Sequence, residues 1–205
     1  MNSSAKNKTP RRTVLVTGCT GGIGRAVAVT FAQNGWNVVG HDCISGDKAR
    51  QLKACITAHG VDFSLIKADF SSKRQVNRFI AQAAELRIDS LINNAGGYLA
   101  AKHFTELQLE DLSAALMVNL STPILLSGCV FDGMKRRKFG RIVNISSIAA
   151  KYGGSGSSVH YRRAQPGVGA PTQNPAPEGA PPNILGKTNP PGAFDTGLHR
   201  QVPQG

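Results

Sequence analysis

Glycines crowd one short segment near the start of the chain, Thr17-Gly18-Cys19-Thr20-Gly21-Gly22-Ile23-Gly24. The segment follows a β-branched run and precedes a helical pattern, so it lies at a turn from a strand into a helix. Glycines let the backbone approach a ligand closely, and a helix start presents free N–H groups and the positive end of the helix dipole. The pattern therefore predicts a pyrophosphate site, although a tight turn alone would also use glycines.

A carboxylate follows at a distance typical of a ribose contact. Asp42 ends the next strand pattern, 24 residues after Gly18. A carboxylate there accepts hydrogen bonds from both ribose hydroxyls and repels a 2′-phosphate, which favours NAD over NADP. Lys48 and Arg50 lie close by in the sequence and keep NADP open as the alternative. The interpretation without a ligand is a solvated aspartate at a strand end.

Strand and helix patterns alternate from residue 13 to residue 161. Apolar or β-branched runs predict strands at 13–17, 36–42, 63–68, 90–93 and 141–146. Helical spacing predicts four helices: one with Ile23, Val27 and Phe31 on a face, one around 52–59, one after Ser71 or Ser72, and one over 105–138 interrupted near Pro123. Short connections between them predict an α/β fold, a single domain with a doubly wound parallel sheet that binds ligands at the carboxyl ends of its strands.

Length and composition agree with one globular domain. The chain has 205 residues, and 40% are hydrophobic, enough for a buried core. Its four cysteines form no Cys-x-x-Cys pair, which argues against a zinc ribbon or a disulfide scaffold and fits the cytoplasm. No apolar run approaches the roughly 18 residues of a membrane span. Residues 1–12 are polar and basic, and we expect a flexible tail rather than a secretory signal.

The net charge of +12 raises the question of nucleic acid. Four positive residues fall within 1–12, and four more are contiguous at 135–138. A solvated surface with a basic tail is the simpler interpretation. Nucleic-acid binding stays as an alternative, which is disfavoured because no basic stripe in the sequence is interleaved with aromatic residues.

Taken together, these motifs resemble the short-chain dehydrogenase/reductase family. The glycine segment is similar to the family's Thr-Gly-x-x-x-Gly-x-Gly pattern, and Asn93-Asn94-Ala95-Gly96 is similar to its Asn-Asn-Ala-Gly motif. The resemblance covers 13–161 and a remnant at 183–200. It implies a Rossmann-like fold and hydride transfer between a nicotinamide dinucleotide and a small alcohol or carbonyl substrate.

The resemblance also implies three catalytic residues. Asn119 matches the asparagine that helps hold a water of the proton relay. Ser147, in preference to Ser146, matches the serine that holds the substrate oxygen, and Tyr161 matches the general acid/base. Each has a simpler interpretation when taken alone: a helix kink for Asn119, a strand end for Ser147 and a surface helix residue for Tyr161.

Further positions match family contacts to the cofactor. Asp69 follows the third strand, where an acidic residue contacts adenine, and a later Pro-Gly segment includes a threonine that contacts the nicotinamide amide. The expected cofactor contacts are Gly18, Thr20, Gly22, Ile23, Gly24, Asp42, Asp69, Asn93, Ala95, Gly96, Pro191, Gly192 and Thr196. No metal site is expected.

The pattern breaks just after the tyrosine. The family's Tyr-x-x-x-Lys places lysine where this chain has Gln165, and Pro166 disfavours a helix there. The lysine lowers the tyrosine pKa, and glutamine supplies no charge to do so. A non-catalytic or defective dinucleotide-binding protein is therefore the alternative, and we expect turnover reduced by about 10²-fold or more.

Residues 162–205 form a Pro/Gly-rich segment with nine of the eleven prolines, typical of irregular chain. One explanation is that 162 to about 180 is a frame-shifted read of a normal helix, because one added base can turn two alanine codons into arginine codons such as those of Arg162 and Arg163. The coding sequence tests this directly. The chain also ends sooner after the Pro-Gly segment than family members do. We therefore expect its C-terminal strands and helices, and the family's homo-oligomer interface, to be incomplete.

Overall fold

The computed structural model describes residues 10–44, 46–97, 102–147 and 183–191. Three expected site residues, Tyr161, Gly192 and Thr196, lie outside this part of the chain. The segment for which a frame shift is predicted, 162 to about 180, and most of the basic tail lie outside it as well.

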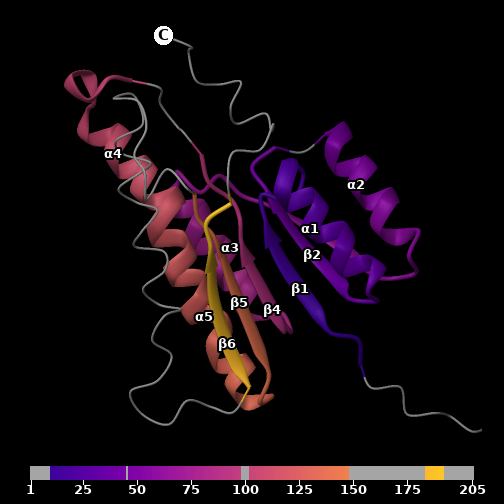
Figure 1. Cartoon of the computed structure of the whole chain (residues 1–205). Helices are drawn as coiled ribbons and strands as arrows, with labels where there is room; N and C mark the ends of the chain where they lie inside the picture. Colours follow the sequence, from indigo (N-terminus) through magenta and orange to yellow (C-terminus); the bar gives the residue numbers. More distant parts are fainter. Residues whose placement is uncertain (1–9, 45, 98–101, 148–182, 192–205) are drawn as a thin grey trace, which may run out of the picture.

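Six strands form one parallel sheet in the order β3-β2-β1-β4-β5-β6 (Figure 1). They are β1 Thr13–Thr17, β2 Asn37–Asp42, β3 Phe63–Lys67, β4 Ser90–Asn93, β5 Gly140–Ile145 and β6 Ile184–Asn189. The predicted doubly wound sheet is confirmed. The strand order reverses between β1 and β4, and the carboxyl ends of strands at such a switch point are where ligands of these sheets bind.

The last strand corrects one expectation. β6 lies inside the segment that its proline content marked as irregular, yet it pairs with β5 from Gly140↔Ile184 to Ile145↔Asn189. Prolines flank this strand at 182 and 190 but do not interrupt it, so each residue in it keeps its N–H. Its first residue, Ile184, is buried in the core.

Helices cover both faces of the sheet (Figure 1). They are α1 Gly22–Gln33, α2 Asp47–Thr57, α3 Lys73–Ala84, α4 Leu109–Leu116 and α5 Thr122–Arg136, with a short 3₁₀ turn at Phe104–Glu106. α1 and α2 share one face, and α3 and α5 share the other. In α1 the deepest residues are the small Gly24, Ala28 and Ala32, whereas the expected Ile23, Val27 and Phe31 are half-buried beside them.

The long helix is not broken at Pro123. α4 continues into α5 through a π-helical turn, Met117–Ser121, in which the Thr122 N–H donates to the Met117 carbonyl. Pro123 then falls in the first turn of α5, where its missing N–H costs little. The predicted interruption is therefore a wider turn that lies just before the proline.

The combined helix Leu109–Arg136 is long and apolar enough to cross a membrane by length and composition. Its apolar residues Leu126, Val130 and Met134 are, however, buried in the cluster formed with the sheet and α3. A helix packed in a protein core meets the same criterion of length and composition, because its buried side is apolar.

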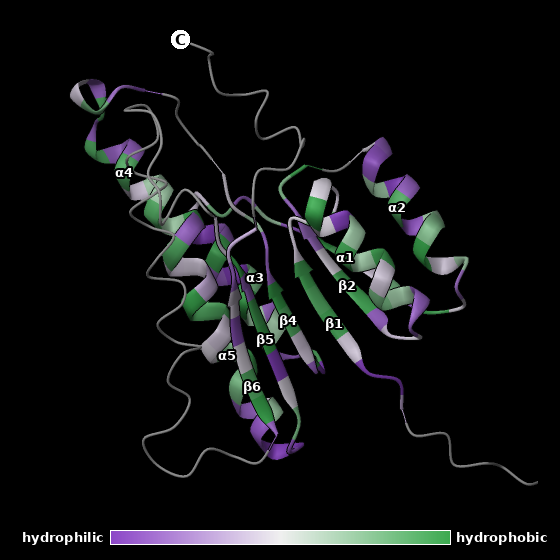
Figure 2. Cartoon of the chain, in the orientation of Figure 1, coloured by the Kyte–Doolittle hydropathy of each residue, from purple (hydrophilic) through white to green (hydrophobic). Residues whose placement is uncertain are grey.

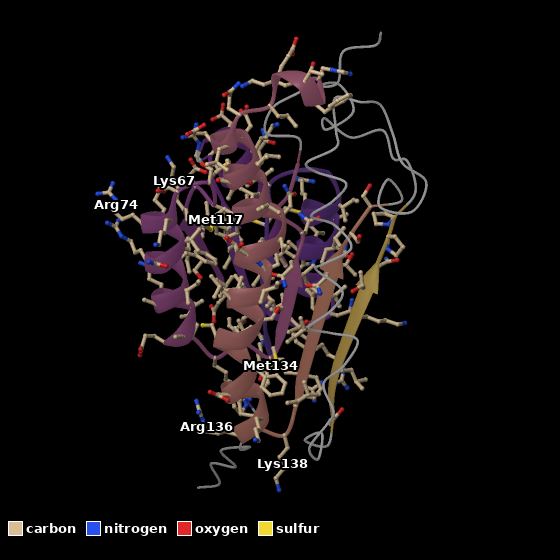
Figure 3. All side chains as sticks on the ribbon, turned by 90° about the vertical axis from the view of Figure 1, so that its left-hand side faces the viewer. Lys67, Arg74, Met117, Met134, Arg136 and Lys138 are labelled. Atoms are coloured by element: carbon tan, nitrogen blue, oxygen red, sulfur yellow. The ribbon has the colours of Figure 1, made fainter. Side chains whose placement is uncertain are left out.

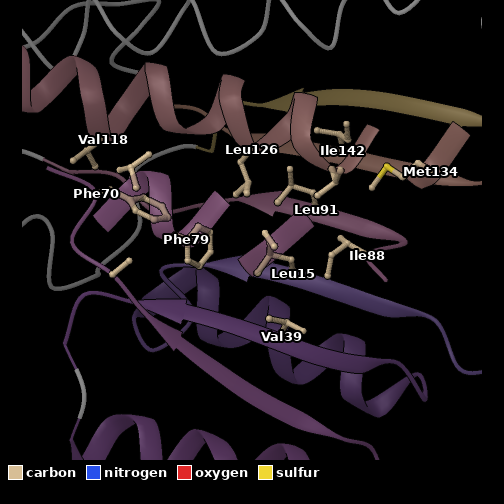
Figure 4. Packing of buried hydrophobic residues seen from close by; sticks show 14 of the residues in the cluster. Leu15, Val39, Phe70, Phe79, Ile88, Leu91, Val118, Leu126, Met134 and Ile142 are labelled. Carbon is tan, nitrogen blue, oxygen red and sulfur yellow. The ribbon is translucent and has the colours of Figure 1, made fainter. Parts of the chain in front are cut away.

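The core divides into two clusters, one on each side of the sheet. Along β1, Val14 and Val16 face α1 and α2, while Leu15 faces α3 and α5, and all three are fully buried. Figure 4 shows Leu15, Leu91 and Phe79 packed beneath Leu126 of α5. The middle residues of strands buried on both faces are apolar, as the green in β1 and β4 shows in Figure 2.

Positive charge gathers at the amino edge of the sheet. Figure 3 shows Arg136 and Lys138 at the opposite end of the molecule from Lys67, at the C-terminal end of α5, where cations stabilise the helix dipole. Arg12 and Arg141 place their guanidinium carbons 3.8 and 4.6 Å from the centroid of the Phe139 ring. The fold thus brings arginines and aromatic rings together here, which the sequence did not suggest. Because both guanidinium groups lie over Phe139, that ring is not an open platform for a base.

Candidate functional site

The glycine segment forms the turn between β1 and α1, as predicted. Gly18 adopts a φ of +64°, in the left-handed region that favours glycine. A Cβ placed on Gly24 would lie 2.1 Å from the carbonyl oxygen of Gly18 and 2.5 Å from Nδ2 of Asn94. The turn therefore folds back tightly on the first turn of α1, and a side chain at position 24 does not fit.

The start of α1 is open to an anion. Gly21 and Gly22 are exposed, and no side chain from the described residues caps the helix. The first N–H groups of a helix have no partner within it, so they remain available to a ligand. Bare backbone, free N–H groups and the positive end of the dipole together suit a phosphate.

Residues after β4 hold the turn in place. The Thr17 hydroxyl accepts the N–H groups of Asn94 and Ala95, each at 2.9 Å. In return, Nδ2 of Asn94 donates to the carbonyls of Thr17 and Gly18 at 2.9 and 3.1 Å. Thr17 and Asn94 were not among the expected site residues, although both belong to the quoted motifs. The sequence signal that could have identified them is that each is a polar residue within one of the two motifs that contact each other here.

The side chain of Asn93 lies in the core. It is 3% exposed, and Nδ2 donates to Oδ1 of Asn144 on β5 at 2.8 Å and to the Ser127 hydroxyl on α5 at 3.2 Å. Because strand side chains alternate in direction, the last residue of β4 turns into the core and not toward the strand end. Ala95 and Gly96 lie past the end of β4, half-buried and exposed respectively, as a cofactor contact requires.

Asp42 lies beside the glycine turn at the end of β2. It accepts hydrogen bonds from the Thr20 hydroxyl, from the Thr20 N–H at 3.3 Å and from the Ile44 N–H at 3.1 Å. Burial alone would raise the pKa of Asp42, but the hydrogen bonds from Thr20 and Ile44 outweigh it, and the pKa lies below its ordinary value. The side chain is thus a carboxylate at neutral pH. Its register partner on the adjacent strand β3 is Lys67.

Asp69 follows β3 at the same edge and is exposed. Its Oδ1 accepts the N–H and hydroxyl of Ser71 at 2.9 and 2.7 Å. Ser72 is the N-cap residue of α3, as expected, but its side chain makes no capping hydrogen bond, so Asp69 orders the turn into the helix instead.

His41 is a site residue that the sequence analysis missed. The ring lies beneath the glycine turn, 2% exposed, where Nδ1 accepts the Gly18 N–H at 3.3 Å. Its only sequence signal is a polar residue at a buried position of an apolar strand.

Asn119 lies in the π-helical turn and is 2% exposed. Its Oδ1 accepts the Gly97 N–H at 3.0 Å, and Nδ2 donates to the carbonyls of Gly97 at 3.3 Å and Ala115 at 3.0 Å. These bonds tie the long helix to the segment that follows the Asn-Asn-Ala-Gly motif. π-Helical turns of this kind occur frequently at functional sites.

Ser147, after β5, and Pro191, after β6, complete the described part of the site. Ser146 is buried and donates its N–H to the Asn189 carbonyl at 2.9 Å, whereas Ser147 is half-exposed. Pro191 is half-buried just beyond β6. The accessible serine at this edge is Ser147, the one that the alignment of the strand favours.

Comparisons with known proteins agree with this arrangement. The sequence profile described as short chain dehydrogenase matches residues 12–205. The acetoacetyl-CoA reductase of Allochromatium vinosum is 34% identical over 191 residues, which cover 91% of this chain and 76% of the relative. The 3-oxoacyl-[acyl-carrier-protein] reductase of Aquifex aeolicus is 34% identical over 195 residues, which cover 90% and 74%.

A solved structure shows the same fold. The short-chain dehydrogenase from Sphingobium yanoikuyae in complex with NADPH superposes with a TM-score of 0.82 at 26% identity, covering 94% of this chain and 75% of that one. With the sheet order, the glycine turn and the family match in agreement, the chain belongs to the short-chain dehydrogenase/reductase family of NAD(P)-dependent oxidoreductases.

Proposed function

We propose that this chain binds an adenine dinucleotide across the carboxyl ends of β1, β2 and β4. The observation that carries the proposal is the uncovered start of α1, folded against Gly18 so closely that position 24 has no room for a Cβ. Gly18, Thr20, Gly22, Ile23 and Gly24 would hold the pyrophosphate, and Asp42 would take the adenosine ribose. Asp69 would lie against the adenine, and Ala95, Gly96 and Pro191 would line the remainder.

The substrate class follows from the family and from two relatives. Both relatives are named for reduction of a ketone in an acyl thioester. We therefore propose a small alcohol or carbonyl substrate, with 3-oxoacyl thioesters as the first class to test. A cytoplasmic location remains part of this proposal.

The proposed chemistry assigns one role to each side chain. The nicotinamide, when bound, supplies or accepts a hydride. The Ser147 hydroxyl would orient the substrate oxygen, and Tyr161 would give a proton to that oxygen or take it away. Asn119, anchored to Gly97 and Ala115, would hold the water through which that proton is exchanged.

NAD is the favoured cofactor in this proposal. The Asp42 carboxylate is charged at neutral pH, and if it takes the adenosine ribose as proposed, it would repel a 2′-phosphate and disfavour NADP. Against this, a cationic residue, Lys67, is the register partner of Asp42 on β3. The solved relative holds NADPH, which makes the comparison of the two cofactors a necessary test.

A second candidate is a dinucleotide-binding protein with little or no catalysis. Gln165 favours it, because no cation stands four residues after Tyr161 to lower the tyrosine pKa. Both candidates share the cofactor site and differ only in turnover.

One experiment tests both candidates. The purified chain is titrated with NADH and with NADPH by calorimetry, and then assayed with acetoacetyl-CoA. Saturable binding of either dinucleotide supports the shared proposal, and absorbance loss at the nicotinamide band then separates an enzyme from a binding protein. Folded protein that binds neither dinucleotide contradicts the proposal.

A further inference from the structure

β2 carries one polar side chain in its buried interior. Val38, Val39 and His41 are 1%, 6% and 2% exposed, and the imidazole points toward the α3 side of the sheet. A buried polar ring is costly unless its nitrogens find partners. Both nitrogens of His41 do, and each partner belongs to a different strand end.

The two partners fix the tautomer of the ring. Nε2 lies 2.9 Å from the Ala68 carbonyl oxygen, which can only accept, so Nε2 carries the proton. Nδ1 then has a lone pair, and it accepts the Gly18 N–H at 3.3 Å. The ring thus links the first residue of the glycine turn to the residue before Asp69.

Aromatic packing fixes the plane of the ring. His41 stacks on Phe70, with centroids 3.8 Å apart and planes within 4°, and it meets Phe79 edge-on at 4.8 Å. Figure 4 shows Phe70 and Phe79 next to each other in the core. Burial keeps this imidazole neutral, because it lowers the pKa of His41 to about 4.

We infer that His41 is a positioning residue for the dinucleotide: it holds the glycine turn at a fixed spacing from the end of β3, through the Gly18 N–H and the Ala68 carbonyl. The inference rests on the proposed cofactor site. Gly18 begins the pyrophosphate turn, Asp42 follows His41 directly, and Asp69 follows Ala68, so one ring orders all three contacts of the adenosine half. The link to Gly18 is the one that matters for binding, because it supports the turn that must accept the phosphates.

Two substitutions separate the two nitrogens. In His41→Asn the amide oxygen can take the place of Nδ1 and accept the Gly18 N–H, whereas the Ala68 bond is lost. In His41→Gln the longer amide can take the place of Nε2 and donate to Ala68, whereas the Gly18 bond is lost. Both variants lose the stacking on Phe70, so they are matched for a purely structural role.

The test measures the affinity of each variant for NADH and for ADP-ribose by calorimetry, together with the midpoint of urea unfolding. We expect His41→Gln to raise both dissociation constants about tenfold, the effect of one lost hydrogen bond, and His41→Asn to stay within about threefold of the native chain. Equal losses in both variants, or none in either, overturn the inference. Failure of the native chain to bind either ligand instead rejects the proposed function.

A measurement on the native chain covers the case in which a variant does not fold. In protein labelled with nitrogen-15 in histidine and glycine, the His41 ring is expected to show a proton on Nε2 alone. Saturation with ADP-ribose is expected to shift the His41 ring and Gly18 amide signals, while nicotinamide mononucleotide leaves both unchanged. A ring protonated on Nδ1, or signals that ADP-ribose does not move, also overturns the inference.

Discussion

The two halves of the sheet are built differently. In the half formed by β1, β2 and β3, the strand ends are joined to each other by polar side chains: His41 links Gly18 to Ala68, and Asp42 links Thr20 to Ile44. In the half formed by β4, β5 and β6, the polar contacts of Asn93 lie inside the core. The proposed cofactor site thus rests on bonds within the described structure. One of the proposed catalytic residues, Tyr161, lies outside the described residues.

The comparison implies that binding and turnover can be changed independently. Substitutions at the ends of β1 and β2 should alter the affinity for the dinucleotide. Substitutions in the second half should alter turnover or stability and leave that affinity alone.

The largest effect is expected from Gly24→Ala. The added Cβ meets backbone, the Gly18 carbonyl, at 2.1 Å, so the turn must open and the pyrophosphate site is lost. We expect NADH affinity to fall by more than about 100-fold, about 2.8 kcal/mol, in calorimetric titration. Gly128→Ala on α5 is the matched control, because its Cβ meets no atom of the described chain within 4 Å. A folded Gly24→Ala protein with native affinity would falsify the cofactor assignment.

A pH effect on stability should be of similar size. The pKa of His41 falls from 6.5 to about 4 on folding, mainly through burial, so the unfolded chain binds more protons between these values. His41 therefore stabilises the fold fully above pH 6.5, and about 3 kcal/mol of that contribution is lost as the pH falls to 4. Asp42, the charged group next to it, titrates lower, because its own pKa is depressed.

Urea unfolding of the native chain and of His41→Gln at several values between pH 4 and 7.5 measures this loss. The slope should be clear in the native chain and reduced in the variant. Hydrogen exchange at pH 5 adds a second measurement. The Gly18 amide, which donates to the titrating His41 ring, should exchange faster than the Gly97 amide, which donates to the Asn119 side chain. A native unfolding free energy that is flat between pH 4 and 6.5 contradicts the burial of a neutral imidazole.

Turnover should respond to a single charge at position 165. Gln165→Lys restores the cation that the family places four residues after the tyrosine, and we expect turnover to rise about 100-fold. Gln173→Lys adds the same charge outside the motif and serves as the control. Equal rates in the two variants would show that Gln165 does not limit turnover.

The sequence predicts the scaffold well because its signals are local. Apolar runs identified five strands, and the glycine turn was identified from the spacing of glycines within eight consecutive residues. β6 was missed because its neighbours in sequence are prolines, whereas what makes it a strand is pairing with β5 far away in the chain. The π-helical turn around Asn119 had no local signal either, since Pro123 suggested a break at the wrong place.

The site was harder to predict than the scaffold. A motif gives the order of residues but not the direction of each side chain, so it does not show that the Asn93 side chain turns into the core, toward Ser127 and Asn144. Asn94 and His41 act through backbone groups of the glycine turn. Such contacts become visible only once three strand ends are brought side by side.

A smaller effect is expected at Asp42. Asp42→Asn keeps the shape of the side chain but removes the charge that repels a 2′-phosphate, and Lys67 remains as its neighbour. The ratio of the NADPH and NADH dissociation constants should shift about tenfold toward NADPH, which titration of both cofactors measures. Asp47→Asn on α2 removes an exposed charge that pairs with Arg50 and should leave the ratio unchanged. If the two variants behave alike, Asp42 does not select the cofactor.

The smallest effect is expected where the second half carries polar groups in its core. Thr122 is fully buried, and its hydroxyl has no hydrogen-bond partner among the described residues. Thr122→Val keeps the branched shape and removes that unsatisfied oxygen, so the free energy of unfolding should rise by about 1 kcal/mol. NADH affinity should not change, because the Thr122 side chain is buried and is not among the groups proposed to hold the dinucleotide. A fall in stability would mean that the hydroxyl holds a buried water, and a change in affinity would mean that the two halves are coupled through the helix that carries Asn119.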